Sequence, residues 1–147
     1  MFKLCWSHWS GTKDENVKAS NIFHGPEGVP EPDKQDYIAN LAKALYASKI
    51  CSYAQGLGTI RAASDKFGWN IDLSECVKLW KGGCIIRAKF LDNIQAAFQK
   101  DPDLPNLMLD PDVAKELELA NHSWREVINY SSPNGIACPS LGGNWWF

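Results

Sequence analysis

A run of 32 residues without proline, from residue 36 to residue 67, narrows the possible folds more than any other part of this sequence. Asp33 precedes the run as a helix N-cap, and Gly68 follows it as a helix stop. A helix of that length spans roughly 48 Å, at about 1.5 Å per residue. The apolar residues in the first half of this run lie on a different helix face from those in the second half, and small residues occupy its middle. We therefore predict a central, largely buried helix on which other helices pack.

Shorter helices are predicted on both sides of this run from capping residues and from apolar spacing. Their predicted ranges are 13–23, 72–80, 84–99 and 111–130. In the first of them, Val17, Ile22 and Phe23 are expected to face inward. Asp72 and Asp110 serve as N-caps, the second with proline at the next position. No segment alternates as a strand does, so we predict an all-α helical bundle around one long central helix.

The chain divides into two parts in composition. Residues 1–35 form an irregular N-terminal segment with a possible short helix and a linker rich in proline and glycine between residues 25 and 32. Residues 36–147 form the helical part. We predict this boundary because three prolines fall within seven residues just before the long helix.

Charge and cysteine content argue against several functional classes. A net charge of -2 gives no overall attraction to nucleic acid or to an acidic membrane surface. No apolar run approaches the roughly 20 residues that span a bilayer, so no membrane association is expected. Five cysteines at irregular intervals are typical of reduced thiols rather than of a secreted disulfide framework. We therefore predict a cytoplasmic protein.

The sequence gives little support for a metal site or for a histidine that acts as a catalytic acid or base. Cys5 and His8 form a Cys-x-x-His pair, but no further ligands follow at zinc spacing, so we assign no metal site. His24 and His122 have no carboxylate or cysteine beside them in sequence. A solvated or hydrogen-bonded role is favoured for both over a role as catalytic base.

A basic group surrounds the glycine pair 82–83, and it consists of Lys78, Lys81, Arg87 and Lys89. If the next helix begins directly after the glycines, its first amides and Arg87 form a candidate anion site. The alternative, which we favour, is structural. Arg87 pairs with Asp92 or Glu75, and its stem packs against Trp80.

Glycine-rich motifs of nucleotide-binding loops and the Gly-x-Ser-x-Gly motif of hydrolases are missing from the sequence. Gly56 and Gly58 lie inside the long predicted helix. There, and at the pair 82–83, we predict that glycine permits the close approach of a neighbouring helix.

Four blocks of sequence carry a family resemblance. They are residues 46–56 (YASKICSYAQG), 67–69 (FGW), 79–91 (LWKGGCIIRAKFL) and 105–109 (PNLML). In order and in spacing they closely resemble the C-terminal helical domain of 6-phosphogluconate dehydrogenase. The likeness extends from Lys13 to Ile136 and so covers nearly the whole chain.

The resemblance implies NADP-dependent oxidative decarboxylation of 6-phosphogluconate to ribulose 5-phosphate in the pentose phosphate pathway, by a cytoplasmic homodimer. In that family the Rossmann domain and the catalytic lysine and glutamate precede the matched region, and an arginine that grips the substrate phosphate falls near Ser7 here. We therefore expect no catalytic, cofactor-binding, substrate-binding or metal-binding residue in this chain. NADP is the cofactor of the intact family, and none is expected to bind this chain alone.

Two functional hypotheses follow from the resemblance. In the first, the chain is a piece of the enzyme that is inactive alone, and both of its ends are breaks in a longer protein. In the second, it is a non-catalytic dimerisation or binding module that pairs with itself or with full-length enzyme. The apolar residues Trp145, Trp146 and Phe147 at the end of the chain motivate the second hypothesis.

Overall fold

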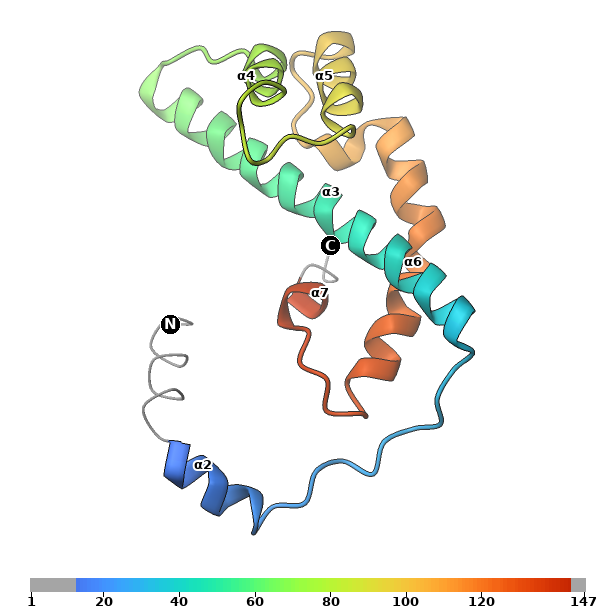
Figure 1. The fold of residues 1–147 in the computed structure, drawn as a ribbon. Coiled ribbons are helices and arrows are strands. Elements are labelled where there is room, and N and C mark those ends of the chain that lie inside the picture. Colours follow the sequence, from blue (N-terminus) through green and yellow to red (C-terminus); the bar gives the residue numbers. More distant parts are fainter. Residues whose placement is uncertain (1–12, 144–147) are drawn as a thin grey trace.

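Every regular element within residues 13–143, the part that the computed structural model describes, is helical. The elements are α2 (Lys13–Ser20), α3 (Lys34–Phe67), α4 (Leu73–Trp80), α5 (Leu91–Lys100), the 3₁₀ helix η1 (Leu107–Leu109), α6 (Pro111–Ser131) and α7 (Pro139–Gly143). Figure 1 shows α3 running through the molecule, with α6 beside one part of it and the pair α4 and α5 beside the other. The predicted all-α architecture around one long helix is confirmed.

The two ends of α3 lie where the capping residues placed them. The Asp33 carboxylate accepts hydrogen bonds from the backbone N–H groups of Gln35 and Asp36, at 2.9 and 3.1 Å. Gly68 ends the helix in the left-handed conformation, with a φ of 67°, and its N–H donates to the carbonyl oxygen of Ser64. Both caps satisfy backbone groups that the helix ends leave unpaired, so the helix limits follow from local sequence.

One face of α3 is buried, and the prediction of a largely buried helix is wrong. The buried residues are Ala44, Ala47, Ser48, Ile50, Cys51, Ala54, Leu57 and Ser64. On the other side, Ile38, Leu41 and Leu45 are 52, 40 and 63% exposed. The reason is that the contacts of α3 are with α6, α7 and η1, together with the apolar residues of α4 and α5, which cover only part of its circumference.

Close packing at the glycines was also predicted wrongly. A methyl group at Gly56, Gly58, Gly82 or Gly83 would meet no described atom of a neighbouring element within 4 Å. These glycines therefore do not serve helix contacts within residues 13–143. Gly83 instead has a φ of 69°, which explains a glycine at that turn.

The N-terminal half of α3 packs against α6 through small side chains. One buried cluster contains Ala44, Ala47 and Cys51 of α3 with Ala120, Trp124 and Val127 of α6. The Trp124 indole N–H donates to the carbonyl oxygen of Leu141 at 3.2 Å, which ties α7 to α6. Near the start of α3, the rings of Tyr37 and Tyr130 meet edge to face with centroids 4.9 Å apart. The large indole thus fills the space that the small α3 residues leave.

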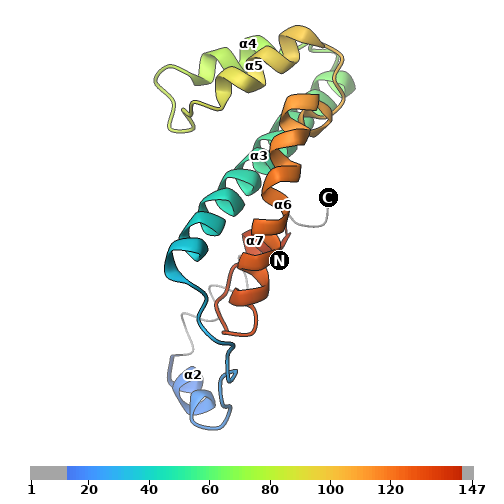
Figure 2. The ribbon, with the colours of Figure 1, turned by 90° about the vertical axis from the view of Figure 1, so that its right-hand side faces the viewer.

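The C-terminal half of α3 packs against larger apolar residues. Its side chains share a cluster with α4, α5, η1 and the start of α6, and the cluster consists of Ile50, Ala54, Leu57, Leu73, Val77, Phe90, Leu91, Ile94, Ala97, Phe98, Leu104, Leu107 and Val113. Full burial of one leucine or isoleucine contributes about 1.5–3 kcal/mol. This cluster therefore holds α4 and α5 together at this end of the molecule, where Figure 2 shows them side by side.

The start of α5 differs from the prediction. The helix begins at Leu91 rather than at Cys84, and residues 84–90 form turns. The Tyr53 hydroxyl donates a 2.6 Å hydrogen bond to the carbonyl oxygen of Ile86. In a helix that carbonyl would accept from its own chain, so a tertiary hydrogen bond has replaced a helical one.

The short N-terminal helix α2 stands apart from the rest of the described chain, as Figures 1 and 2 both show. It ends at Ser20, earlier than predicted, and none of its residues is buried. Val17, Ile22 and Phe23 are 54, 70 and 74% exposed, so the prediction that they face inward is wrong. The extended segment before α3 carries this helix away from the core, so no other helix of residues 13–143 packs against these side chains.

That extended segment touches the helical body next to the end of α6. The N–H of Val29 donates to the side-chain oxygen of Asn134 at 3.2 Å. Gly28 has a φ of 79°, and a Cβ there would lie 2.6 Å from the same oxygen. Only glycine fits such a close approach without displacing its neighbour, so this contact fixes the path of the linker.

The second half of the chain follows its predicted caps. The Asp110 carboxylate accepts from the N–H groups of Asp112 and Val113, at 3.1 and 3.2 Å, and Pro111 occupies the first position of α6. The short helix α7 was not predicted, because its five residues include two glycines. None of the helices within residues 13–143 is long and apolar enough to cross a membrane.

Candidate functional site

The segment between α4 and α5 is the place where the sequence offered an anion site. The chain turns after Gly83 instead of starting a helix there, because α5 begins at Leu91. The glycine pair therefore presents no row of helix N-terminal amides. The candidate anion site required a helix that begins directly after the glycines, so its prediction is wrong.

The basic residues of this segment are partly paired, but not as predicted. Lys78 contacts Glu75 at 3.0 Å, and Lys81 contacts Asp92 at 2.5 Å. These lysines occupy both carboxylates that were predicted for Arg87, so that pairing is wrong. Among residues 13–143, no carboxylate forms an ion pair with Arg87. The two lysine pairs are largely exposed, and each contributes at most about 1 kcal/mol.

A cavity of about 470 Å³ lies between α3 and the segment that follows α4. Its wall is mainly apolar and comes from Tyr53, Trp80, Ile85 and Ile86. Its polar edge consists of Lys49, Ser52, Gly56 and Arg87. The size and the mixture of an apolar wall with a few polar groups fit either a small ligand or an inserted side chain of a partner.

Tyr53 holds the wall of this cavity in place. Its hydroxyl donates to the carbonyl oxygen of Ile86 at 2.6 Å, and its ring lies 6.3 Å from that of Phe90. Burial raises the pKa of Tyr53, and the electrostatic effect of the nearby Cys84 raises this pKa further. The tyrosine therefore keeps its proton at neutral pH and acts as a hydrogen-bond donor rather than as a base.

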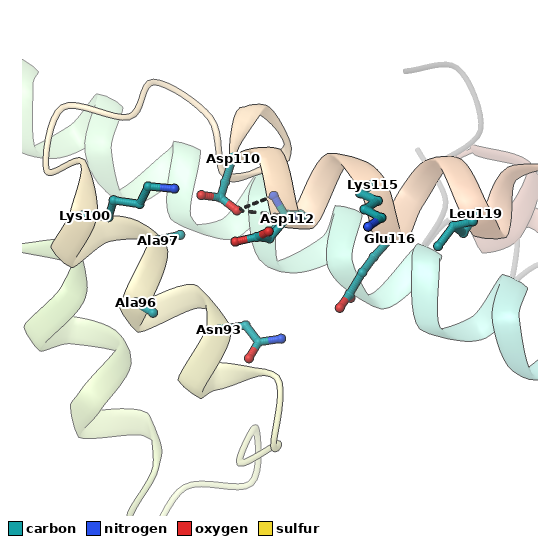
Figure 3. Close-up of a pocket in the computed structure, with 10 residues that line it drawn as sticks. Asn93, Ala96, Ala97, Lys100, Asp110, Asp112, Lys115, Glu116 and Leu119 are labelled. Carbon is teal, nitrogen blue, oxygen red and sulfur yellow. Dashed lines mark hydrogen bonds between the residues drawn. The ribbon is translucent and has the colours of Figure 1, made fainter.

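A second cavity, of about 520 Å³, lies between α5 and α6 (Figure 3). Charged and polar residues dominate its lining, which includes Asn93, Lys100, Asp112, Lys115 and Glu116. Figure 3 shows that Asp110 turns its carboxylate toward the backbone at the start of α6, where it serves as the helix cap. The side chains carry both signs of charge and form no nucleophile and base pair, so the cavity has no evident catalytic arrangement.

Beside this cavity, Tyr46 of α3 donates a 2.6 Å hydrogen bond to the Glu116 carboxylate of α6. Burial, followed by the hydrogen bond and the charge of Glu116, raises the pKa of Tyr46 to about 12. The Tyr46 ring also meets the ring of Phe90 edge to face at 5.7 Å. This tyrosine thus links α3, α6 and the start of α5.

The remaining sequence candidates do not converge on one place. His24 and His122 are both exposed, as expected of solvated histidines. Cys5 and His8 lie outside the described residues, and their interpretation stays a prediction. Among the described residues, no three histidine, cysteine, aspartate or glutamate side chains gather closely enough to hold a metal ion.

Sequence reasoning did not predict either of the two cavities described above. The first one joins residues 49–56 to residues 80–87, and only the fold brings these segments together. One signal was present, because Lys49, Ser52 and Gly56 are spaced three and four residues apart and therefore share a helix face.

The described residues thus define an all-helical domain, and the two cavities described above lack a catalytic arrangement of side chains. The family model described as "6-phosphogluconate dehydrogenase, C-terminal domain" matches residues 6–144. The chain belongs to the 6-phosphogluconate dehydrogenase family, and it matches the C-terminal domain of that family. This confirms the resemblance read from the sequence blocks.

Individual relatives give the same result. The chain is 45% identical over 136 residues to 6-phosphogluconate dehydrogenase, decarboxylating 1, of Oryza sativa subsp. japonica, covering 92% of this chain and 28% of that protein. It is 43% identical over 135 residues to the decarboxylating enzyme of Synechocystis sp., with the same coverage. The solved 6-phosphogluconate dehydrogenase of Plasmodium falciparum superposes with a TM-score of 0.81 at 31% identity, over 90% of this chain and 29% of that one. The chain therefore spans less than a third of the length of these relatives.

Proposed function

We propose that this chain is the helical part of an NADP-dependent 6-phosphogluconate dehydrogenase, the enzyme that oxidatively decarboxylates 6-phosphogluconate to ribulose 5-phosphate. The observation that carries the proposal is the match of the family's C-terminal domain to residues 6–144. The Plasmodium falciparum relative has been solved with its cofactor NADP⁺ and with its substrate 6-phosphogluconate. These two molecules are accordingly the cofactor and substrate that we propose for the intact enzyme.

The 147 residues by themselves do not catalyse this reaction in our proposal. Hydride transfer requires the nicotinamide to be held beside the substrate, with both molecules oriented by protein groups. The sequence contains no glycine-rich dinucleotide motif, and the described cavities offer no base positioned for proton transfer. The cytoplasm is the proposed location, although relatives include chloroplastic forms.

The contribution that we assign to the chain itself is subunit pairing, with a second copy or with a full-length enzyme. Ile38, Leu41 and Leu45 expose apolar surface along one side of α3, and Ile85 is fully exposed beside the first cavity. Exposed apolar surface of this extent is typical of a region that another protein covers.

The test begins with NADP reduction by the purified chain in the presence of 6-phosphogluconate, run beside a mock purification from the same host. We expect no absorbance increase above the mock. Tagged chain is then mixed with an intact relative, such as the Synechocystis enzyme, and the co-purified protein is measured. Activity of the chain alone would contradict the proposal that it is non-catalytic. A monomeric chain that binds neither itself nor the intact enzyme would contradict the pairing role.

A further inference from the structure

The cavity between α3 and the segment that follows α4, here called the first cavity, joins an apolar wall to a positively charged edge. Its wall includes the rings of Tyr53 and Trp80. Among the described residues that line it, Lys49 and Arg87 are the charged ones, and no carboxylate is present. Its volume of about 470 Å³ lies within the roughly 300–1,000 Å³ that is typical of small-molecule sites. The first cavity therefore suits a ligand that is itself partly apolar and partly negative.

A third cavity, of about 430 Å³, adjoins the first one at Arg87, because this residue lines both. The other charged residues of its lining are Lys81, Lys89 and Asp92. Lys81 contacts Asp92 at 2.5 Å, so the carboxylate of this lining is already paired. Arg87 and Lys89 are exposed, and neither forms an ion pair with a carboxylate of residues 13–143. The two cavities thus carry local positive charge in a chain whose net charge is -2.

The combination of wall and edge narrows the chemistry of the ligand. A sugar phosphate or an inorganic anion would pair with Arg87 but has no apolar part to cover the wall. A neutral apolar molecule, or an apolar side chain of a partner, would cover the wall but leave the guanidinium without a counter-charge. Aromatic walls favour a flat ring, and a guanidinium binds planar or tetrahedral anionic groups through two parallel hydrogen bonds. Only a molecule with both parts satisfies both surfaces.

We propose that the first cavity binds a small amphiphilic anion. Its flat apolar body lies against the wall that contains Trp80, and its carboxylate, sulfonate or phosphate group lies at Arg87, on the side of the third cavity and Lys89. Side chains alone supply the charge, so no helix N-terminus is needed. This inference goes beyond the proposed function and depends neither on catalysis nor on subunit pairing.

Gly56 keeps the α3 side of the first cavity open. It lines the cavity, and a Cβ at this position would meet no described atom of a neighbouring element within 4 Å. A glycine inside a helix lowers the stability of that helix by about 1 kcal/mol relative to alanine. A larger side chain would therefore suit the helix, but it would take space that we assign to the apolar body of the ligand.

The test compares three probes on the full chain. 8-Anilinonaphthalene-1-sulfonate has both an apolar body and an anionic group, N-phenyl-1-naphthylamine has the same rings without the sulfonate, and inorganic sulfate has the charge alone. Fluorescence titration at micromolar concentrations should show a single site for the anionic dye. We expect it to bind at least about fivefold more tightly than the neutral dye, because only the anionic dye pairs with Arg87. An equal concentration of sulfate should not displace it.

Arg87→Gln tests the charged edge. It should weaken binding of the anionic dye at least about fivefold and leave binding of the neutral dye within about twofold, because the apolar wall is unchanged. Lys115→Gln is the matched control, since it also removes one positive charge and Lys115 lines the second cavity instead. It should leave the affinity for both dyes unchanged.

Gly56→Leu tests the apolar part of the site. Its side chain should weaken binding of both dyes at least about fivefold, since both carry the same rings. Gly58→Leu is the matched control, because Gly58 lies in the same helix, has equally free space around a Cβ, and does not line the first cavity. Thermal unfolding followed by circular dichroism should show that both leucine variants are at least as stable as the wild type, so lost binding does not reflect lost structure.

Each alternative result overturns a stated part of the proposal. A wild type that does not bind the anionic dye, or that binds it equally well after Arg87→Gln and Gly56→Leu, overturns the site. Arg87→Gln that weakens binding of both dyes equally overturns the pairing of the anionic group with Arg87. Sulfate that displaces the dye at equal concentration overturns the role of the wall. NADP reduction and subunit pairing are measured separately, so failure here leaves the proposed function standing.

Discussion

The two halves of α3 reach a buried core by different means. In the N-terminal half, small residues of α3 face α6, and Trp124 is the one large side chain of the buried cluster. In the C-terminal half, many leucine, isoleucine, valine and phenylalanine side chains from several elements share the core. The contrast shows that similar burial can depend on one residue or be distributed over many. The first arrangement is expected to be more sensitive to a single substitution.

Removing the indole is the strongest way to test this contrast. Trp124 is 5% exposed, and Trp124→Ala would leave a cavity that the alanines opposite cannot fill. The change also removes the hydrogen bond to Leu141. We expect a loss of about 3–5 kcal/mol in the free energy of unfolding, measured by urea titration with far-ultraviolet circular dichroism at one fixed protein concentration.

The control for this substitution is Trp69→Ala, because Trp69 is 58% exposed and lies beyond the end of α3. It should cost less than about 1 kcal/mol. Equal losses for the two tryptophans would mean that the cluster around Trp124 does not stabilise the fold as its burial indicates.

A substitution in the other half sharpens the comparison. Ile94 is fully buried on α5, among many apolar neighbours that are able to shift toward the space it leaves. Ile94→Ala should cost about 2–4 kcal/mol, less than the loss at Trp124, by the same titration. Ile85→Ala is the control, since Ile85 is fully exposed. A loss larger than that of Trp124→Ala would reverse the proposed difference between the halves.

This difference between the halves was not visible in the sequence, although the helix limits were. Local signals placed Asp33, Gly68, Asp72 and Asp110 correctly, because a cap is decided by the few residues around it. The same signals wrongly predicted that a helix begins at Cys84. There the Tyr53 hydroxyl donates to the carbonyl oxygen of Ile86, within the segment that was predicted to be helical.

Burial and the candidate site were harder to predict. Apolar spacing marks both faces of α3 but does not tell which one α6 covers, so Leu41 and Leu45 are exposed on a helix that was predicted to be largely buried. The predicted ion pair of Arg87 is wrong because Lys78 pairs with Glu75 and Lys81 pairs with Asp92. In both cases the sequence offered two alternatives, two apolar helix faces or two kinds of cation for one carboxylate. Only the three-dimensional arrangement decides between them.

A smaller loss of stability is expected from a substitution at Asp110, between η1 and α6. Asp110 is 6% exposed and caps α6 through two backbone N–H groups. Asp110→Ala should cost about 1–2 kcal/mol, because those groups lose their acceptor. Asp110→Asn keeps an acceptor and should cost markedly less. Equal losses for the two variants would show that the charge, and not the cap, carries the effect.

The smallest effect we predict concerns pH and the contact between Tyr46 and Glu116. The pKa of Tyr46 is raised from 10.0 to about 12 in the folded chain, by burial first and then by the Glu116 carboxylate. The folded state therefore holds this proton more tightly than the unfolded state does. The resulting stabilisation is fully present below pH 10 and disappears as the pH rises from 10 to about 12.

Tyr46→Phe isolates this contribution, because it keeps the ring that packs on Phe90 and removes only the hydroxyl. The wild type should be more stable than the variant at neutral pH, and the difference should shrink between pH 10 and 12. Tyr46 is 38% exposed, so solvent screening keeps the difference small. Urea titrations of both proteins at matched pH values measure it, and other groups that titrate there cancel in the comparison. A difference that stays constant across this interval would mean that the folded chain does not hold the Tyr46 proton more tightly than the unfolded chain does.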